Sequence, residues 1–327
     1  MKGLAPVFIV VAAMAAVPLL GVSNVMLNFL VVALMIALAG QGWNVLGGYG
    51  GQYSFGHAAF FGTGAYVTAV LQVHYGVNAW IAFGLGIAGG AVVAAVVGGL
   101  TFRSGLRGAY FALVTLAFAE VLRISASVAP ITGAGVGTLV KLDLRPAALQ
   151  FGSRAAFYWM ILTLVAIASI VTRLLERSRF GVWLVAVREN EDAATALGVN
   201  ATAIKLAAMV ISGAITAAAG CFYVQYFLFI DSGLAYGTRI SIEALLTPII
   251  GGVGTVFGPL LGALVVRGLG EGARMVAGGE APGVDLVVYG CVLVLIIAFA
   301  PRGLIGGLAQ LRGRWGRPAP LPKAGHG

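Results

Sequence analysis

The stretch YWMILTLVAIASIV, residues 158–171, contains no charged side chain and shows no alternation of polar and apolar residues. A second apolar run, VDLVVYGCVLVLIIAFA, occupies residues 284–300 and contains a single charge, Asp285. Continuous apolar runs that approach the ~20 residues needed to cross a bilayer are typical of transmembrane helices. A transmembrane barrel would instead require short segments of alternating hydrophobicity. These two stretches therefore predict membrane-spanning helices.

The composition of the whole chain agrees with this prediction. Of its 327 residues, 60% are hydrophobic and 9% are charged, whereas a soluble domain carries about a quarter charged residues. The formal net charge is +9. In a soluble protein such a charge would suggest nucleic acid as a partner, but in a membrane protein it reflects basic loops facing the cytoplasm and anionic lipid. We expect an all-α, polytopic transmembrane bundle that binds no nucleic acid.

Apolar runs of spanning length predict eight helices. Residues 240–267 differ, because Pro248, Pro259 and several glycines interrupt them, and they predict two half-length helices around a turn. The total is eight spans plus a re-entrant pair, or ten spans if both halves cross. The eight predicted spans are 4–22, 25–47, 53–72, 79–101, 108–127, 155–172, 204–227 and 283–300.

Basic residues predict the orientation. With both termini in the cytoplasm, 13 of the 20 Lys and Arg face inward, as the positive-inside tendency requires. The predicted organisation is a transmembrane permease domain over 1–305, with a cytoplasmic loop at 173–205, and a basic tail at 306–327. The first apolar segment could instead be a cleaved signal peptide. The thirteen residues are Lys2, Arg103, Arg107, Arg173, Arg177, Arg179, Arg188, Lys205, Arg302, Arg312, Arg314, Arg317 and Lys323.

Small residues recur every four positions in two of the predicted spans. One row comprises Gly86, Gly90, Ala94 and Gly98, and the other comprises Gly213, Ala217 and Cys221. Such rows let helix backbones approach closely within a bilayer. We expect both rows to pack helices together, with Cys221 and Cys291 as small apolar residues rather than a disulfide or a metal pair.

Several chemistries are missing from the sequence. No lysine follows a glycine, so no Gly-Lys-Ser/Thr phosphate loop exists, and no histidine precedes a glutamate, so no HExxH zinc site exists. The glycine-rich stretch at 47–57 lacks the lysine of a phosphate loop. We expect it to break a helix at the cytoplasmic mouth of a cavity. The chain is therefore predicted to be no enzyme, with no metal site, no cofactor and no ATP site of its own.

Polar side chains within apolar segments are candidates for a solute pathway, because ionisable groups inside a membrane are costly and usually face protein or water. Glu120 could pair with Arg123, three residues away, and Glu243 could pair with Arg239, four residues away. Either pair could be structural or could line the pathway, and the same alternatives hold for His57. The full candidate set is Gln52, Ser54, His57, Glu120 and Glu243.

The loop at 173–205 carries an unusual cluster of charge. RENEDAATALG, residues 188–198, combines helix-forming residues, early acidic residues and a glycine at its end, which predicts a short helix that stops at Gly198. The preceding SRFGVWLVAVR, residues 178–188, suggests a segment lying along the inner membrane interface. Such a helix could dock in a groove of another protein, or the loop could be solvated and have no partner.

These residues carry a resemblance to a known family. Glu191, Ala193, Ala194 and Gly198 form E-x-A-A-x-x-x-G, which resembles the EAA loop of ABC-importer permeases. GYGGQYSFGHAAFFGTGAY at 48–66 and IIGGVGTVFGPLLGA at 249–263 resemble the LivM-type permease family of branched-chain amino acid ABC transporters. RGAYFALVTLAF at 107–118 also fits, so the resemblance covers approximately residues 25–305.

The resemblance implies a permease of the bacterial inner membrane that pairs with a LivH-type permease. It also implies two cytoplasmic ATPase subunits that bind ATP, and a periplasmic solute-binding protein. In the family this loop is the coupling helix, which moves with the ATPases and rocks the attached spans. The resemblance assigns that coupling role here to Arg188, Glu189, Glu191, Ala194 and Gly198.

Two other functions remain open at this stage. An ion-coupled secondary transporter would use Glu120 or Glu243 as its coupling site, and a passive channel for small amides or urea would use the broken helices at 240–267. ATP-dependent uptake distinguishes the importer from both. The resemblance implies leucine, isoleucine and valine as substrates, with other amino acids, amides, urea and aromatic acids as alternatives.

Overall fold

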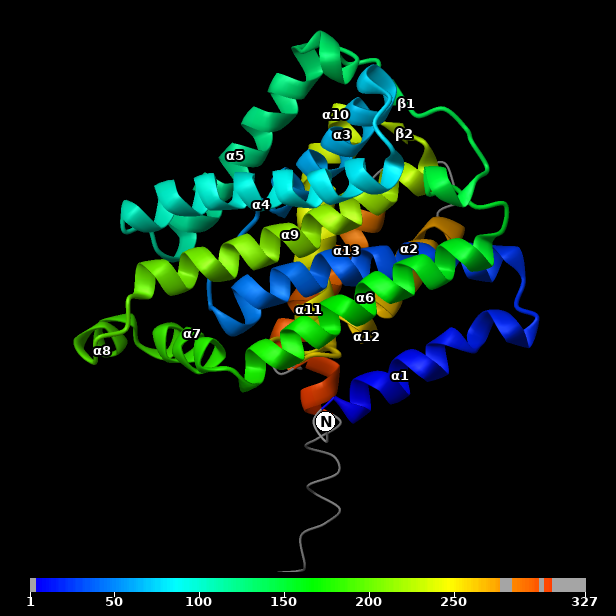
Figure 1. Ribbon diagram of the computed structural model, residues 1–327. Helices are drawn as coiled ribbons and strands as arrows, with labels where there is room; N and C mark the ends of the chain where they lie inside the picture. The colour runs from blue at the N-terminus through cyan, green and yellow to red at the C-terminus, as the bar shows by residue number, and fades with distance from the viewer. Residues whose placement is uncertain (1–3, 277–283, 300–302, 308–327) are drawn as a thin grey trace, which may run out of the picture.

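The computed structural model describes the chain except residues 1–3, 277–283, 300–302 and 308–327. The described residues form thirteen α-helices and one two-stranded antiparallel ribbon, so the predicted all-α bundle is confirmed (Figure 1). The basic tail predicted at 306–327 lies almost entirely outside the described residues. The elements are α1 (Ala5–Ala15), η1 (Val17–Leu20), α2 (Asn24–Trp43), η2 (Asn44–Tyr49), α3 (His57–Tyr75), α4 (Ala79–Arg103), α5 (Gly108–Val128), η3 (Pro130–Thr132), β1 (Thr138–Leu139), η4 (Pro146–Ala148), α6 (Arg154–Arg177), α7 (Arg179–Glu189), α8 (Glu191–Ala196), α9 (Ala201–Phe227), β2 (Phe229–Ile230), α10 (Ser232–Tyr236), α11 (Thr238–Gly251), α12 (Gly258–Val276) and α13 (Val284–Phe299).

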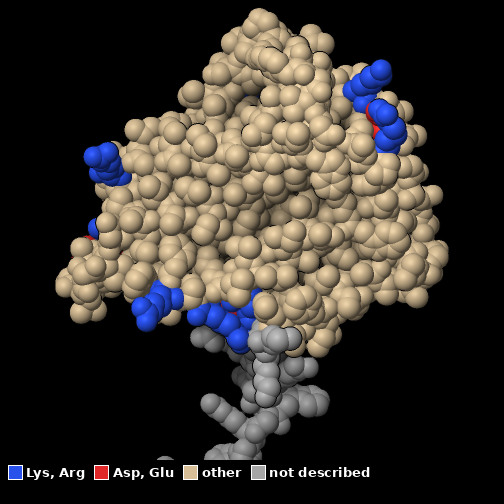
Figure 2. All heavy atoms as spheres, in the orientation of Figure 1, with Lys and Arg blue, Asp and Glu red and all other residues tan. Residues whose placement is uncertain are grey.

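All eight predicted spans correspond to helices. Five helical stretches of the described residues are long and apolar enough to cross a membrane by themselves: Asn24–Tyr49, Ala79–Arg103, Gly108–Val128, Arg154–Arg177 and Ala201–Phe227. Figure 2 shows the matching surface: the broad middle of this face carries no Lys, Arg, Asp or Glu, and the blue atoms lie at its edges. The chain is a multi-pass membrane protein.

Two opposite ends of the bundle can be recognised in Figure 1. One carries the helices α7 and α8, and we call it the α8 end; the other carries the ribbon in which Thr138 pairs with Ile230. Gly303 approaches Gly252 at the α8 end. At the ribbon end, Tyr158 at the start of α6 donates a hydrogen bond of 2.8 Å to the carbonyl of Met14 in α1. Helix α1 therefore begins toward the α8 end.

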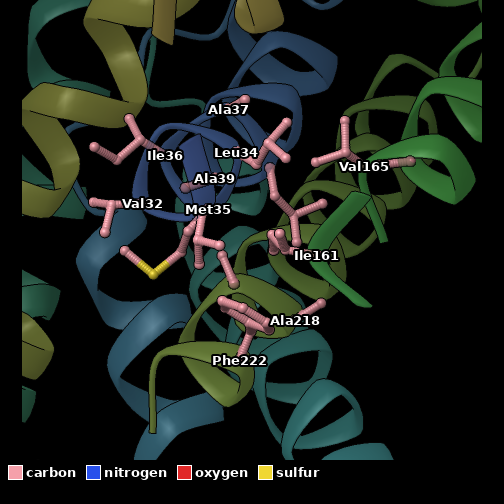
Figure 3. Close-up of a cluster of buried hydrophobic side chains, with 14 of the residues drawn as sticks. Val32, Leu34, Met35, Ile36, Ala37, Ala39, Ile161, Val165, Ala218 and Phe222 are labelled. Atoms are coloured by element: carbon pink, nitrogen blue, oxygen red, sulfur yellow. The ribbon is translucent and has the colours of Figure 1, made fainter. Parts of the chain in front are cut away.

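Helix α2 is the centre of the bundle. Every residue from 31 to 50 is buried, and the apolar side chains of α2 pack against α6 and α9 around Ile161, Val165 and Phe222 (Figure 3). An apolar helix that is surrounded on all sides by other helices needs no polar face. This packing explains why the sequence of α2 shows no amphipathic pattern.

The two rows of small residues pack helices together, as predicted, and the structure shows that they pack against each other. A Cβ atom added at Gly90 of α4 would lie 2.2 Å from the Cβ of Ala217 in α9, and one added at Gly213 would lie 2.4 Å from the Cβ of Ala94. The Cys221 side chain is buried in the same contact, whereas Cys291 is exposed. Helices α4 and α9 therefore interlock at a separation that only small residues permit.

The glycine-rich stretch breaks a helix, also as predicted. Helix α2 loosens into a π-helix at Asn44–Tyr49, and α3 starts only at His57. Residues 50–56 between them are not helical. Gly51 has a φ of +66°, a conformation that glycine adopts without steric cost. The Trp43 indole holds this segment by donating a 2.8 Å hydrogen bond to the carbonyl of Ser54.

Residues 240–267 form two helices, but the second is not half-length. Helix α11 has 14 residues and α12 has 19. The turn between them lies at the α8 end, where the Gly254 N–H donates a 2.8 Å hydrogen bond to Asn44 Oδ1 and approaches the carbonyl of Gly48. Helix α11 begins beside the start of α3, where Ser241 accepts a 2.9 Å hydrogen bond from the N–H of Ala58, and α12 runs back antiparallel to α11. The first helix is thus half-length, as predicted, and the number of crossings stays a prediction.

Candidate functional site

The polar loop folds into two helices, α7 and α8. Ser178 accepts a 3.1 Å hydrogen bond from the N–H of Gly181 at the start of α7. Helix α7 ends at Glu189, and Asn190 is extended, with a φ of −157°. The Asn190 side chain then accepts a 2.9 Å hydrogen bond from the N–H of Ala193 and so caps α8. The short helix predicted within 188–198 is therefore confirmed over Glu191–Ala196, whereas Arg188 and Glu189 belong to α7. Asn190 separates the two helices because it satisfies a free N–H group better at a helix start than inside a helix.

Gly198 ends α8 in the predicted manner. Its φ is +87°, which lies in the left-handed region that costs other residues about 1–2 kcal/mol. Its N–H donates a 2.9 Å hydrogen bond to the carbonyl of Thr195, and the next N–H, of Val199, donates one of 3.1 Å to Ala194. A Cβ at Gly198 would meet no atom of this chain within 4 Å, so the space beside it is open.

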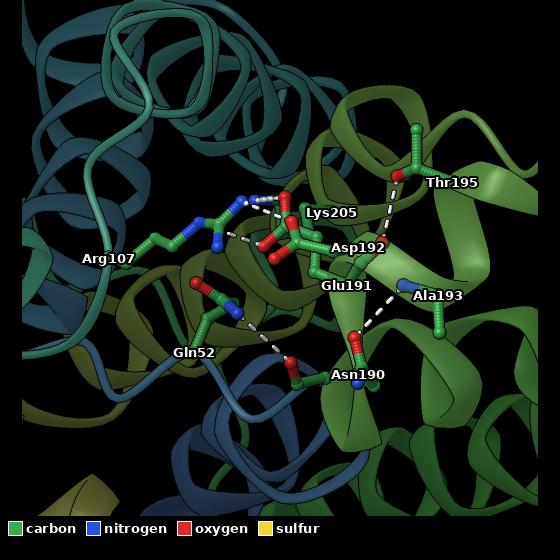
Figure 4. Close-up of polar contacts among 9 residues, drawn as sticks. Gln52, Arg107, Asn190, Glu191, Asp192, Ala193, Thr195 and Lys205 are labelled. Atoms are coloured by element: carbon green, nitrogen blue, oxygen red, sulfur yellow. Dashed lines mark hydrogen bonds and ion pairs between the residues drawn. The ribbon is translucent and has the colours of Figure 1, made fainter.

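Glu191 connects α8 to the transmembrane helices. One carboxylate oxygen lies 2.6 Å from Lys205 Nζ in α9, and the other lies 3.3 Å from Arg107 Nε in the α4–α5 turn. Asp192 lies 3.3 Å from the same Arg107 guanidinium. Figure 4 shows these carboxylates facing Arg107, with Lys205 beside them. The sequence predicts Lys205 and Arg107 only as cytoplasmic charges. It does not predict their contact with Glu191, because 14 and 84 positions separate them from it.

Lys205 is the most deeply buried member of this network. Its side chain is 2% exposed, and its ammonium lies 5.2 Å from the centre of the Phe102 ring in α4. Lysine is rarely buried without a partner, and here it has both an anion and an aromatic face. The network therefore fixes the position of α8 relative to α4, α5 and α9.

Arg188 makes its contacts inside the chain. Its Nη1 donates a 2.9 Å hydrogen bond to the carbonyl of Gly48, and its Nη2 donates one of 2.5 Å to Glu189. Its aliphatic stem packs on Gly51, where a Cβ would lie 2.4 Å from Arg188 Cγ. The Glu189 side chain is more exposed than that of Arg188, with 68% of it accessible. Arg188 thus links α7 to the helix break at 44–56.

The surface of α8 presents one large apolar side chain. Leu197 is 87% exposed, whereas Ala194 is 4% exposed and packs against Val187 and Ala201. Ala194 is therefore part of the small core that holds α7, α8 and α9 together. Leu197 was missed from the sequence, although an apolar residue directly before a helix-ending glycine could have suggested it.

The candidate pathway residues are not brought together in one place. Ser54 and His57 are fully buried near the break at 50–56, where His57 Nε2 lies 2.8 Å from Ser212 Oγ. His57 Nδ1 has no hydrogen-bond partner. Gln52 is half-buried and donates a 3.3 Å hydrogen bond to the carbonyl of Gly50.

Glu120 lies apart from that cluster, on the exposed side of α5. Arg123 donates two hydrogen bonds to its carboxylate, of 2.9 and 2.6 Å, so the predicted pair is confirmed. Around the pair, Leu113 and Val121 are 62% and 58% exposed. A charged pair on an apolar helix face would be costly against lipid, so this side of α5 is a candidate surface for contact with protein or water.

Glu243 lies in a third place, in the first half of α11. Arg239 donates a 2.9 Å hydrogen bond to its carboxylate, which confirms the second predicted pair. The Glu243 side chain is 8% exposed. It lines a cavity together with Arg267 and Arg274 of α12, neither of which is predicted from the sequence as a pathway residue.

The ribbon end carries a polar hollow of about 450 Å³, lined by the α3–α4 turn and residues 139–150. Asp143 and Arg145 pair within it, and hydrogen bonds from Arg145 lower the pKa of the Asp143 carboxyl. Metal sites are not indicated by the described part of the chain, in which no three His, Cys, Asp or Glu side chains are grouped so as to hold an ion.

Comparison with known proteins connects this geometry to a family. Residues 25–297 match the family described as "Branched-chain amino acid transport system / permease component". The chain is 28% identical over 309 residues to the high-affinity branched-chain amino acid transport system permease protein LivM of Salmonella typhimurium, covering 87% of this chain and 71% of that protein. The corresponding protein of Escherichia coli is 29% identical over 311 residues, with the same coverage.

A more distant similarity extends to a second kind of permease. The protein LivH of Salmonella typhimurium is 23% identical over 307 residues, covering 86% of this chain and 94% of that protein. No solved structure matches the chain significantly.

Proposed function

Because the chain belongs to the family of branched-chain amino acid transport permease components, we propose that it forms half of a translocation path for apolar amino acids in an ABC importer. Two ATPase subunits drive the import by docking on α8 and the adjoining residues 188–198. The chain binds no cofactor itself, because its partners bind the ATP.

The observation that carries this proposal is the attachment of α8. A docking helix can transmit force only if it is firmly connected to the spans that must move. Glu191 supplies that connection through Lys205 in α9 and Arg107 before α5. The exposed Leu197 beside Gly198 offers an apolar contact for a groove on the ATPase. A movement of the docked ATPase would therefore shift α8 and these spans together.

The partner permease would be a LivH-type chain. The exposed side of α5 suits this contact, since its apolar residues would be buried and the Glu120–Arg123 pair would face the path between the two permeases. A periplasmic binding protein would deliver the solute at the ribbon end. The α8 end and both termini would face the cytoplasm of a bacterium with this chain in its inner membrane.

The test compares the chain alone with the assembled importer in liposomes. The chain alone should transport no labelled leucine and hydrolyse no ATP. The assembly of the chain with a LivH-type permease, two ATPases and the binding protein should accumulate leucine when ATP is supplied to the ATPase side. Robust uptake by the chain alone, or uptake by the assembly that follows an ion gradient in the absence of ATP, would refute the proposal.

A further inference from the structure

Helix α7 has two apolar faces. The inner face, which includes Leu184 and Val187, is buried, and Leu184 packs on the helix break, since a Cβ at Gly50 would lie 3.1 Å from Leu184 Cδ1. The outer face carries Val182 and Trp183, which are 63% and 45% exposed. Neighbouring large apolar groups that remain exposed indicate a surface for lipid or for another protein.

The outer face of α7 follows directly on the exposed side of α6. Along α6, exposed side chains recur on one side of the helix at Trp159, Ile167, Leu174 and Arg177. Eighteen positions separate Trp159 from Arg177, which corresponds to about 27 Å at the rise of an α-helix and is close to the ~30 Å of the hydrocarbon core. A tryptophan at one end and an arginine at the other are typical of the two membrane interfaces. Arg177 therefore lies at the interface of the α8 end.

The junction of α6 and α7 is positively charged. Arg177 and Arg179 are both exposed. The carboxylate nearest to them in sequence, that of Glu176, accepts a 2.8 Å hydrogen bond from Tyr49 and is also paired with Arg173. Positive charge at this level attracts the anionic headgroups of a bilayer.

The outer face of α7 has the composition of a helix that lies in the headgroup layer. Arg179, Val182, Trp183 and Ala186 are exposed and recur at spacings of three and four residues, so they share one side of the helix. The acidic residue of α7, Glu189, is at its last position, where it pairs with the neighbouring arginine. Tryptophan and aliphatic residues on one side, with arginine beside them, are typical of interfacial helices.

We propose that α7 lies in the headgroup layer at the α8 end and binds anionic phospholipid. Val182 and Trp183 contact the acyl chains, and Arg177 and Arg179 bind the phosphates. Lipid is favoured over a protein partner because this face follows on the exposed side of a spanning helix and carries positive charge beside its apolar residues. Since α7 leads through Asn190 into α8, the bound lipid holds α8 at a fixed depth. The inference goes beyond the proposed function and is independent of the transported solute.

The first experiment measures what surrounds Val182. The exposed Cys291 is replaced by serine, and a nitroxide is attached to Val182→Cys. The labelled chain is placed in vesicles of phosphatidylcholine and phosphatidylglycerol, alone and with its partner subunits. Oxygen concentrates in lipid, whereas a charged nickel chelate stays in water. The nitroxide should collide more often with oxygen than with the chelate in both preparations. In the chain alone, a nitroxide on Thr195→Cys, at an exposed position of α8, should show the reverse.

The second experiment measures the lipid preference at Trp183. Phospholipids brominated in their acyl chains quench tryptophan, and the Trp183 signal is the difference between the parent chain and Trp183→Phe. Brominated phosphatidylglycerol should associate more strongly than brominated phosphatidylcholine, by about fivefold for each arginine at low ionic strength. Arg177→Gln and Arg179→Gln together should remove this preference. The control is Arg103→Gln, at the exposed arginine that ends α4, and it should retain the preference.

Three results would overturn the inference. The first is a nitroxide at position 182 that meets the nickel chelate more often than oxygen, which would show a solvated face. The second is a nitroxide that neither oxygen nor the chelate reaches in the assembly, which would assign the face to a protein partner. The third is equal quenching by the two lipids, or a preference that persists without Arg177 and Arg179. None of these measurements uses ATP-driven uptake, so failure of the proposed function can be distinguished from failure of this inference.

Discussion

The Glu191 carboxylate in α8 lies 2.6 Å from the ammonium of Lys205 in α9, and only 2% of the lysine side chain is exposed. This ion pair connects α8 to α9 directly, in addition to the covalent connection through residues 197–200. Helix α9 in turn contacts α4, because Ala217 of α9 packs against Gly90 of α4. Displacing α8 would therefore displace α9 and α4 together, as a coupling element requires.

Replacing Lys205 with methionine should uncouple transport. The variant keeps most of the buried side-chain volume but leaves Glu191 with Arg107 alone, and breaking a buried ion pair costs up to about 3–5 kcal/mol. Because the Glu191 side chain is 18% exposed, we expect a smaller loss of stability and correct insertion. Leucine uptake should fall by about tenfold or more, the equivalent of 1.4 kcal/mol in coupling, while the ATPases still bind.

The matched control is Lys141→Met, at an exposed lysine near the ribbon end. Uptake by this variant should equal that of the parent chain. If both variants transport normally, the ion pair has no part in coupling.

Leu197→Asp should weaken docking of the ATPases. The leucine is 87% exposed, so the substitution should cost little stability in the chain itself. A carboxylate at the centre of an apolar contact would remain without a partner on docking, which costs about 2–5 kcal/mol. The measurement is the amount of ATPase subunit that co-purifies with the chain. Leu142→Asp is the control, at a leucine 62% exposed near the ribbon end, and normal recovery with Leu197→Asp would contradict the prediction.

Gly198→Val should distort the end of α8 without disturbing the membrane body. The φ of +87° is most costly for a β-branched side chain, and the residue has no neighbouring atoms that could clash. Uptake should therefore fall while the amount of inserted protein stays constant. Gly198→Asn should retain much of the uptake, since asparagine tolerates the left-handed conformation. Equal loss in the two variants would point to the side chain itself rather than to the backbone.

The spans are predictable from the sequence because each one is a continuous run of apolar residues. Continuous apolar runs identify α4, α6 and α9, and the four-residue spacing of small residues predicts a close-packing face on α4 and on α9. Proline and glycine identified the break between α11 and α12. The start of α8 is also predictable, because an asparagine followed by two acidic residues, Glu191 and Asp192, is typical of a helix start. Asn190 could therefore have been predicted to cap α8.

The candidate sites were harder to predict because their contacts join distant parts of the chain. Nothing in the sequence places Arg107 beside Glu191, or Arg188 beside Gly48. Arg267 was missed for a different reason. The continuous apolar run ends at Arg267, whereas α12 continues to Val276 and includes Arg267, Glu271 and Arg274.

Gly90→Ala should destabilise the bundle. A Cβ at this position would lie 2.2 Å from the Cβ of Ala217, and forcing an extra group into a packed contact costs about 1–3 kcal/mol. We expect a lower melting temperature of the purified chain. Gly84→Ala in the same helix is the control, because its Cβ would meet nothing within 4 Å and alanine favours a helix. Equal melting temperatures of the two variants would show that α4 and α9 do not interlock there.

The last prediction concerns the side of the membrane on which the turn between α11 and α12 lies. Val253 lies in this turn and is 37% exposed, and the neighbouring Gly254 approaches Gly48 and Arg188. With Cys291 replaced by serine, Val253→Cys should react with a membrane-impermeant thiol reagent from the same side as Thr195→Cys in α8. Val136→Cys should react only from the opposite side. The chain is expressed without its ATPases, which could cover the turn, and intact vesicles of both orientations are compared. A re-entrant pair that dips in from the ribbon end would expose Val253 to the side of Val136 instead, and such labelling would favour eight crossings over ten.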